Sequence, residues 1–221
     1  MIQAMATSRA EHSTLLLPRL LLATLAWLFW PCFTQAADYG NEVTVKIESG
    51  RAIASSLLSG RREIPLDVQE TVSSSDASGI NAIVVTSRRL LGFSSRTLAW
   101  SKRDRELYER VLDRLVLPTF CVVRTDKHLY GFRGTNGIWL DEPLGIQETI
   151  AVARSTDYGA VFVTNERLVG FTSLLGDFSS KTLGIHEQVT RLDIEQGLIL
   201  VTTNKRILVF GSRLSGWEEF D

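Results

Sequence analysis

The chain repeats itself every 39 residues over most of its length, and this period constrains the fold more than any other feature. Invariant columns of the repeat include Thr86, Thr125, Thr164 and Thr203, and Phe93, Phe132, Phe171 and Phe210. No insertion or deletion interrupts the register, so the units are expected at 66–104, 105–143, 144–182 and 183–221. Equivalent units of this size bury their apolar faces by packing on one another, which predicts a repeat architecture.

The best-defined part of each unit predicts a β-hairpin. In the first unit, the apolar stretch 83–86 is followed by a two-residue loop, Ser87-Arg88, and by a second apolar stretch, 89–93. The loops of the other units begin with Asp or Asn, which tolerate the backbone angles of tight turns. Alternate residues on both sides of these strands are apolar, so both faces of each sheet must be covered by neighbouring sheets.

Each unit also has an extended stretch before the hairpin and a shorter one after it, which gives three to four strands per unit. The segment 103–117 alone has apolar spacing that suits an amphipathic helix. It aligns without a gap on segments of the other units that are typical of strands, so we expect a strand there too.

Units of about 40 residues with four short strands resemble the blades of a β-propeller. The expected fold is therefore all-β, a small propeller of four 39-residue blades plus a shortened amino-terminal blade. Residues 38–65 supply this addition, since Val43, Val45 and Ile47 alternate with polar residues. They form either a shortened fifth blade or strands that close the ring by pairing with the last unit, and a four-bladed ring is the alternative. The repeat matches no named propeller subfamily.

The first 37 residues have the features of a signal peptide. Arg9 and Arg19 precede an apolar run over 20–33, and small residues follow, so cleavage is expected near Ala36 or Ala37. The run is shorter than the roughly 20 residues of a membrane span. We therefore expect an exported protein, periplasmic or secreted, with no stable membrane insertion after cleavage and a single domain over 38–221.

Cleavage would leave Cys121 as the only cysteine, so no intramolecular disulfide is expected. Its apolar neighbours predict a buried packing residue. The net charge of −1 and the pI of about 6.3 give no global attraction to nucleic acid, and no nucleic-acid partner is expected. With His128 and His186 as the only histidines after cleavage and no phosphate-loop or dinucleotide motif, neither a metal site nor a cofactor is expected.

Three further columns recur once per unit and are therefore interpreted as structural. They are an acidic column of Glu70, Glu109, Glu148 and Glu187, a basic column of Arg89, His128, Arg167 and Arg206, and an aromatic column of Trp100, Trp139 and Trp217 with Phe in the third unit. An active site is asymmetric, whereas a residue present in every unit makes one contact per unit. We expect the acidic column to pair with the basic column and the tryptophans to pack.

If the hairpin loops all lie on one side of the ring, they form a basic rim. Its residues are Arg88, Arg89, Lys127, His128, Arg167, Lys205 and Arg206. This rim favours a non-catalytic binding or scaffold protein that presents it to an envelope protein or an anionic glycan. The alternative is a carbohydrate-active enzyme with carboxylates near the ring axis, which convergence of Asp141, Asp157 or Asp177 in one pocket would indicate.

Overall fold

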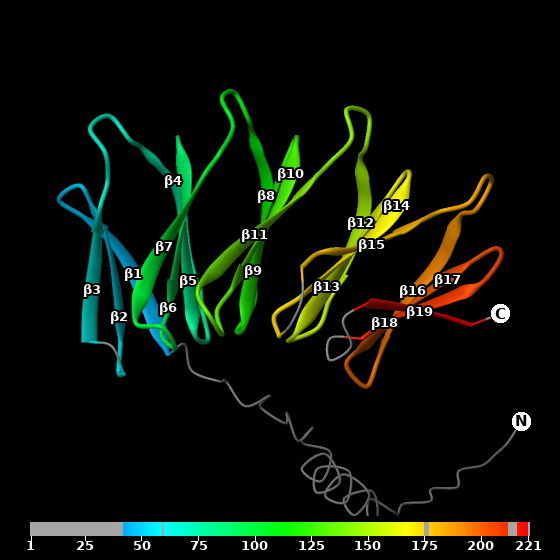
Figure 1. The fold of residues 1–221 in the computed structure, drawn as a ribbon. Helices are drawn as coiled ribbons and strands as arrows, with labels where there is room; N and C mark the ends of the chain where they lie inside the picture. Colours follow the sequence, from blue (N-terminus) through cyan, green and yellow to red (C-terminus); the bar gives the residue numbers. More distant parts are fainter. Residues whose placement is uncertain (1–41, 59, 175–176, 212–215, 221) are drawn as a thin grey trace, which may run out of the picture. The chain divides into compact units, whose positions relative to one another are not determined.

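The computed structural model describes residues 42–58, 60–174, 177–211 and 216–220. The predicted signal peptide and its cleavage site lie outside the described residues. Within the compact unit 39–221, the described strands form five antiparallel sheets, four of them with four strands and the first with three (Figure 1). Among the described residues no helix is long and apolar enough to cross a membrane. The fold is the all-β arrangement of repeated propeller blades that the period predicts.

The first blade consists of β1 (Val43–Glu48), β2 (Arg51–Ser56) and β3 (Gly60–Pro65). These strands pair only with one another in the described chain, and their apolar face packs on the second blade. The N–H of Leu66 donates to the carbonyl of Gly50 at 2.9 Å. In the next blade, the N–H of Arg105 donates in the same way to the carbonyl of Arg88 in the hairpin turn, so the turn at Gly50 corresponds to that hairpin turn. The first blade is thus a shortened blade of three strands, which pair with one another and not with the described strands of the last unit.

The other blades each have four strands that pair in sequence order. The second blade contains β4 (Val72–Ser78), β5 (Asn81–Thr86), β6 (Arg89–Ser94) and β7 (Ala99–Asp104). The third contains β8 (Val111–Val116), β9 (Phe120–Thr125), β10 (His128–Arg133) and β11 (Ile138–Pro143). The fourth contains β12 (Ile150–Ser155), β13 (Gly159–Thr164), β14 (Arg167–Thr172) and β15 (Ser179–Thr182). The last contains β16 (Val189–Glu195), β17 (Leu198–Thr203), β18 (Ile207–Gly211) and β19 (Gly216–Phe220). The segment with helical spacing therefore forms β8, as its register predicts.

In the third, fourth and last blades, a phenylalanine lies against a glycine of the preceding blade. An added Cβ at Gly92, Gly131 or Gly170 would approach a ring carbon of the next blade's phenylalanine to 2.6 Å or less. These rings are 2% exposed or less, and the apolar clusters join consecutive blades around them. Glycine is required here because the ring occupies the space of a side chain. The last blade has Val209 at this position.

Each tryptophan of the column packs on a phenylalanine of its own blade, and two of them also bond the blade before it. Trp100 is half-buried against Phe93, with ring centroids 5.4 Å apart, and its indole N–H donates to the carbonyl of Arg62 at 3.1 Å. Trp217 donates in the same way to Ser179 at 3.0 Å. The indole N–H of Trp139 is buried without a hydrogen-bond partner among the described residues, and its ring packs on Phe132 with centroids 5.0 Å apart. The column is therefore a packing column and not an exposed platform for a sugar ring.

Candidate binding rim

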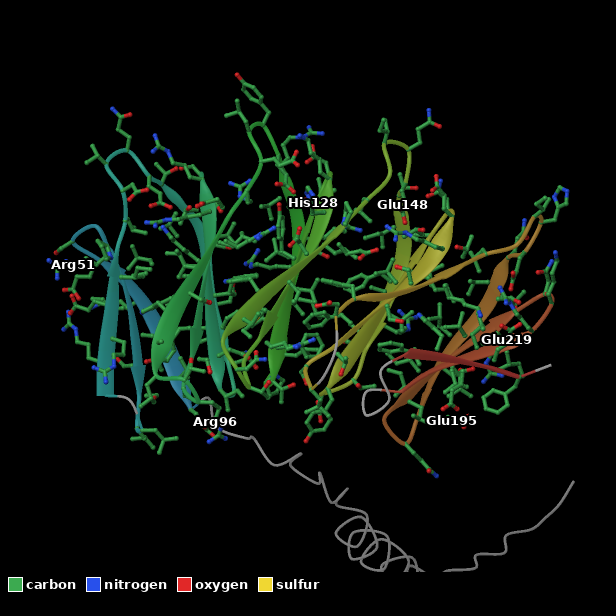
Figure 2. The ribbon with its side chains drawn as sticks, in the orientation of Figure 1. Arg51, Arg96, His128, Glu148, Glu195 and Glu219 are labelled. Atoms are coloured by element: carbon green, nitrogen blue, oxygen red, sulfur yellow. The ribbon has the colours of Figure 1, made fainter. Side chains whose placement is uncertain are left out.

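The hairpin turns and the loops between blades lie at one end of the sheets, which we call the rim. The hairpin turns of the four-stranded blades are 87–88, 126–127, 165–166 and 204–206. The loops between blades are 66–71, 105–110, 144–149 and 183–188. Figure 1 shows both sets at the upper end of the view, with the connecting loops projecting beyond the turns. Figure 2 places His128 and Glu148 toward this end and Arg96 at the other.

The threonine column shapes the hairpin turns. The hydroxyl oxygen of Thr86 accepts hydrogen bonds from the N–H groups of Arg88 and Arg89, at 3.2 and 2.9 Å. The same hydroxyl lies 2.5 Å from a carboxylate oxygen of Glu70, to which it donates. A small hydroxyl side chain satisfies the turn without protruding from it, which explains why threonine recurs in every unit.

The acidic and basic columns are in contact in every four-stranded blade. The pairs are Glu70 with Arg89, Glu109 with His128, Glu148 with Arg167 and Glu187 with Arg206. In the fourth blade, Nε and Nη2 of Arg167 donate to the two carboxylate oxygens of Glu148 at 2.8 and 3.2 Å. In the third blade, Nδ1 of His128 lies 3.0 Å from Glu109, which also accepts from the hydroxyl of Tyr130 at 2.9 Å. Every one of these carboxylates is buried, so each pair is a desolvated contact.

These pairs also hold the connecting loops in place. The carboxylate of Glu148 accepts the N–H of Gly145 at 2.9 Å and so closes its loop. Nη2 of Arg89 donates to the carbonyl of Pro65, in the last strand of the preceding blade, at 2.9 Å. In the third blade, which has histidine, Arg105 instead links the connecting loop to the preceding blade by donating from Nη2 to the carbonyl of Thr86, at the end of its second strand, at 2.6 Å. The rim is therefore a rigid frame that ties each turn, loop and neighbouring blade together.

The pairs shift the acidity of the carboxyl groups. Burial by itself would raise the pKa of Glu148, but hydrogen bonds from Arg167 and from the N–H of Gly145 outweigh it and hold the pKa below its usual value. At Glu187 the hydrogen bond from Arg206 has the largest influence and lowers the pKa to about 2. Burial, followed by the hydrogen bond to Glu109, raises the pKa of Tyr130, so this phenol stays protonated and donates.

The low pKa of Glu187 predicts acid sensitivity that depends on this side chain. A depressed carboxyl pKa stabilises the fold fully above the unfolded value, near about 4.3, and this contribution disappears as the pH falls to about 2. We expect the urea midpoint of the parent protein to fall over this window and that of Glu187→Gln to fall less steeply. Equilibrium unfolding followed by fluorescence at several pH values measures both, and an identical pH dependence for the two proteins would contradict the assignment.

The predicted basic rim is largely engaged in internal contacts. Arg89, His128, Arg167 and Arg206 face their glutamates, as described above. At the exposed turns, Lys127 pairs with Glu106 at 2.8 Å, and Nζ of Lys205 donates to the carbonyl of Ile185 at 2.7 Å. Arg88 is exposed at the first turn. The structure places all seven residues at the rim and gives six of them acceptors within the chain, and their role as one anion site stays a prediction.

A column of exposed aliphatic side chains on the rim was missed by the sequence reasoning. It consists of Val68, Leu107, Ile146 and Ile185, one in each connecting loop, and we call it the tip row. The least exposed of them, Leu107, is still 76% exposed. The adjacent Tyr108 is 87% exposed. The spacing of 39 residues could have identified this column, because each member lies two residues before a glutamate of the acidic column.

The carboxylates that break the repeat are dispersed. Asp141 pairs with Arg103 at 2.7 Å, and none of the described cavities is lined by two of Asp141, Asp157 and Asp177. Asp157 does line a cavity of about 480 Å³ together with Glu42, which pairs with Arg96 at 3.4 Å. This cavity lies among the turns at the end opposite the rim.

The remaining chemistry-bearing residues give no further site among the described residues. No group of three or more His, Cys, Asp or Glu in that part of the chain could hold a metal ion. Cys121 is fully buried, and burial raises the pKa of its thiol, which agrees with the predicted packing role.

No protein-family model matches the chain, and no curated protein matches it in sequence. Similar solved structures include Prp20p of Saccharomyces cerevisiae, at 8% identity and a TM-score of 0.41, with 78% of this chain and 56% of that chain covered. PorZ of Porphyromonas gingivalis, described as a surface component of the type-IX secretion system, is 9% identical, with a TM-score of 0.38 and coverage of 82% and 27%. Hsv2 of Kluyveromyces lactis is 7% identical, with a TM-score of 0.35 and coverage of 82% and 83%. The chain thus spans about half or less of the length of the first two, and these likenesses say nothing about a ligand or an activity.

Proposed function

We propose that this chain is an exported, non-catalytic binding or scaffold protein that docks through its rim on another component of the cell envelope. The tip row is the observation that carries this proposal. Each four-stranded blade is preceded by a loop that exposes one aliphatic side chain to water. Such a side chain lacks the stabilisation that burial of its apolar surface would provide. Burial against a partner restores that stabilisation.

The rim is built to present these side chains. Each connecting loop is closed by a carboxylate that is itself held by a hairpin turn, so the loop is ordered before a partner arrives. Preorganised loops lose little conformational entropy on binding. Because most of the basic residues are engaged internally, an apolar surface of the partner is favoured over an anionic glycan.

Removing the tip row should release the protein from its partner without unfolding it. We expect the variant Val68→Ser, Leu107→Ser, Ile146→Ser, Ile185→Ser to lose at least about tenfold of its association with the envelope fraction, because each lost apolar contact is worth about 1 kcal/mol or more. Fractionation of expressing cells with quantitative blotting measures the loss. Leu57→Ser with Leu58→Ser, on exposed leucines at the other end of the first blade, is the matched control.

Equal release of the tip-row variant and the control would contradict the proposal, as would a tip-row variant that fails to differ from the parent. Urea unfolding verifies that both variants fold, since exposed substitutions change stability by about 0.5 kcal/mol or less each. The carbohydrate-active enzyme is the second candidate, favoured only by the cavity that Glu42 and Asp157 share. Loss of glycan hydrolysis in Glu42→Gln with unchanged envelope association would support it instead.

A further inference from the structure

We infer that the surface on which the rim docks is a lipid bilayer, into whose interface the tip row inserts. This inference rests on the proposed function and names the partner of the same site. It concerns reversible docking on the membrane surface by loop tips, and the strands of the blades stay outside the bilayer.

The first reason is the isolation of the tips. Each stands on its own loop, one per blade, next to a polar or amphipathic residue at Gln69, Tyr108, Gln147 or His186. Three of these neighbours have positive φ angles, 66° at Gln69, 63° at Tyr108 and 59° at His186, which only glycine adopts without strain. The loops thus accept a strained backbone next to an exposed aliphatic side chain. A fluid interface takes up separate side chains without the matched pockets that a folded protein partner must provide.

The second reason is that no member of the tip row lines a described cavity. Two of these cavities lie between connecting loops, with Leu183 and Arg110 among their lining residues, but the aliphatic tips point away from both. An extended peptide or a helix would bind in a groove. Projecting aliphatic side chains instead favour a partner whose fluid apolar region they can penetrate, such as a lipid bilayer.

The third reason is the arrangement of polar groups at the base of the tips. Lys205 donates to the carbonyl of Ile185, and Lys127 pairs with Glu106, the neighbour of Leu107. Each ammonium group has three N–H donors and uses one in the contact named, so these lysines are left with donors for a lipid phosphate at the base of the tips, although their charge is partly offset. Tyr108, with its apolar ring and polar hydroxyl, is the kind of residue that favours the membrane interface. Because Glu106 lies among the same loops, we expect only a moderate preference for anionic lipid.

Vesicle flotation tests this inference with the protein recovered from the envelope of expressing cells. The probes are vesicles of phosphatidylcholine alone and vesicles in which part of it is replaced by phosphatidylglycerol. We expect the parent to float with both, somewhat more strongly with the anionic vesicles, and the four-serine tip-row variant to partition at least about tenfold less. The control Leu57→Ser, Leu58→Ser should float like the parent. All three proteins share the same amino terminus, so residues 1–41 cannot account for a difference between them.

Absence of parent flotation with either vesicle, or equal flotation of the parent and the tip-row variant, would overturn the bilayer inference. The envelope fractionation described above separates this failure from failure of the proposed function. If the tip-row variant is released from the envelope although the parent binds no vesicle, the rim docks on a protein and only the bilayer is wrong. If the variant is neither released nor altered in flotation, both are wrong.

Discussion

Gly131→Ala is expected to lower the free energy of unfolding by about 3 kcal/mol, because the added methyl group overpacks a closed interface between blades. Its Cβ would lie within 2.7 Å of three carbons of the Phe171 ring. That ring is fully buried and also packs on Phe120 and Phe178, at centroid distances of 5.4 and 4.8 Å. The ring therefore has no space to move into, and the two blades must separate.

Urea unfolding followed by tryptophan fluorescence measures this loss. Gly216→Ala is the matched control, since its Cβ would meet no atom within 4 Å, and we expect a change of about 0.5 kcal/mol or less. In the double variant Gly131→Ala, Phe171→Leu, the smaller side chain should relieve part of the overlap, so that it loses less than the sum of the single changes. A Gly131→Ala protein as stable as the parent would show that the ring does not fill this glycine pocket.

Breaking the pair of Glu148 and Arg167 is expected to cost about 3 kcal/mol, because either single change leaves a desolvated charge without its partner. The side chain of Glu148 is 2% exposed, and that of Arg167 is 22% exposed. Glu148→Gln also weakens the closure of the loop at Gly145, whereas Arg167→Ala also removes contacts to Glu142 and to the carbonyl of Pro143. Both single variants should therefore unfold at lower denaturant concentration than the parent.

A double-mutant cycle isolates the pair from these additional contacts. We expect the double variant Glu148→Gln, Arg167→Ala to lose at least about 1 kcal/mol less than the sum of the single losses. Glu166→Gln, on an exposed glutamate of the adjacent turn, should change stability by about 0.5 kcal/mol or less. Strict additivity across the cycle would mean that the two side chains do not interact in solution.

Most of the fold could be predicted from the 39-residue period of the sequence. Because Phe132 and Gly92 each recur at 39 residues, the units and their hairpins could be predicted, and segment 111–116 could be assigned as a strand against its helical spacing. The contact of Glu70 with Arg89 followed in the same way from a constant separation. Repetition predicts these features because an equivalent residue has an equivalent neighbour in every blade.

The candidate site was predicted less well, for two physical reasons. The sequence predicted that Arg167 and Arg206 pair with glutamates and also counted both in the basic rim, although a guanidinium held by a buried carboxylate is less available to a ligand. Ile146 and Ile185 have the composition of buried residues, and only the projection of their loops beyond the turns exposes them. Exposure of an aliphatic residue is a property of the fold that composition does not reveal.

Fluorescence from a dye on the tip row tests the docking account most directly. Cys121 is fully buried, so an Ile146→Cys variant in a Cys32→Ser background offers one accessible thiol for an environment-sensitive label. On addition of isolated envelope material, the label at position 146 should shift its emission to shorter wavelength, as it does on leaving water, while the same label at Leu57→Cys should not shift. An unchanged spectrum at position 146, or an equal shift at both positions, would contradict docking through the rim.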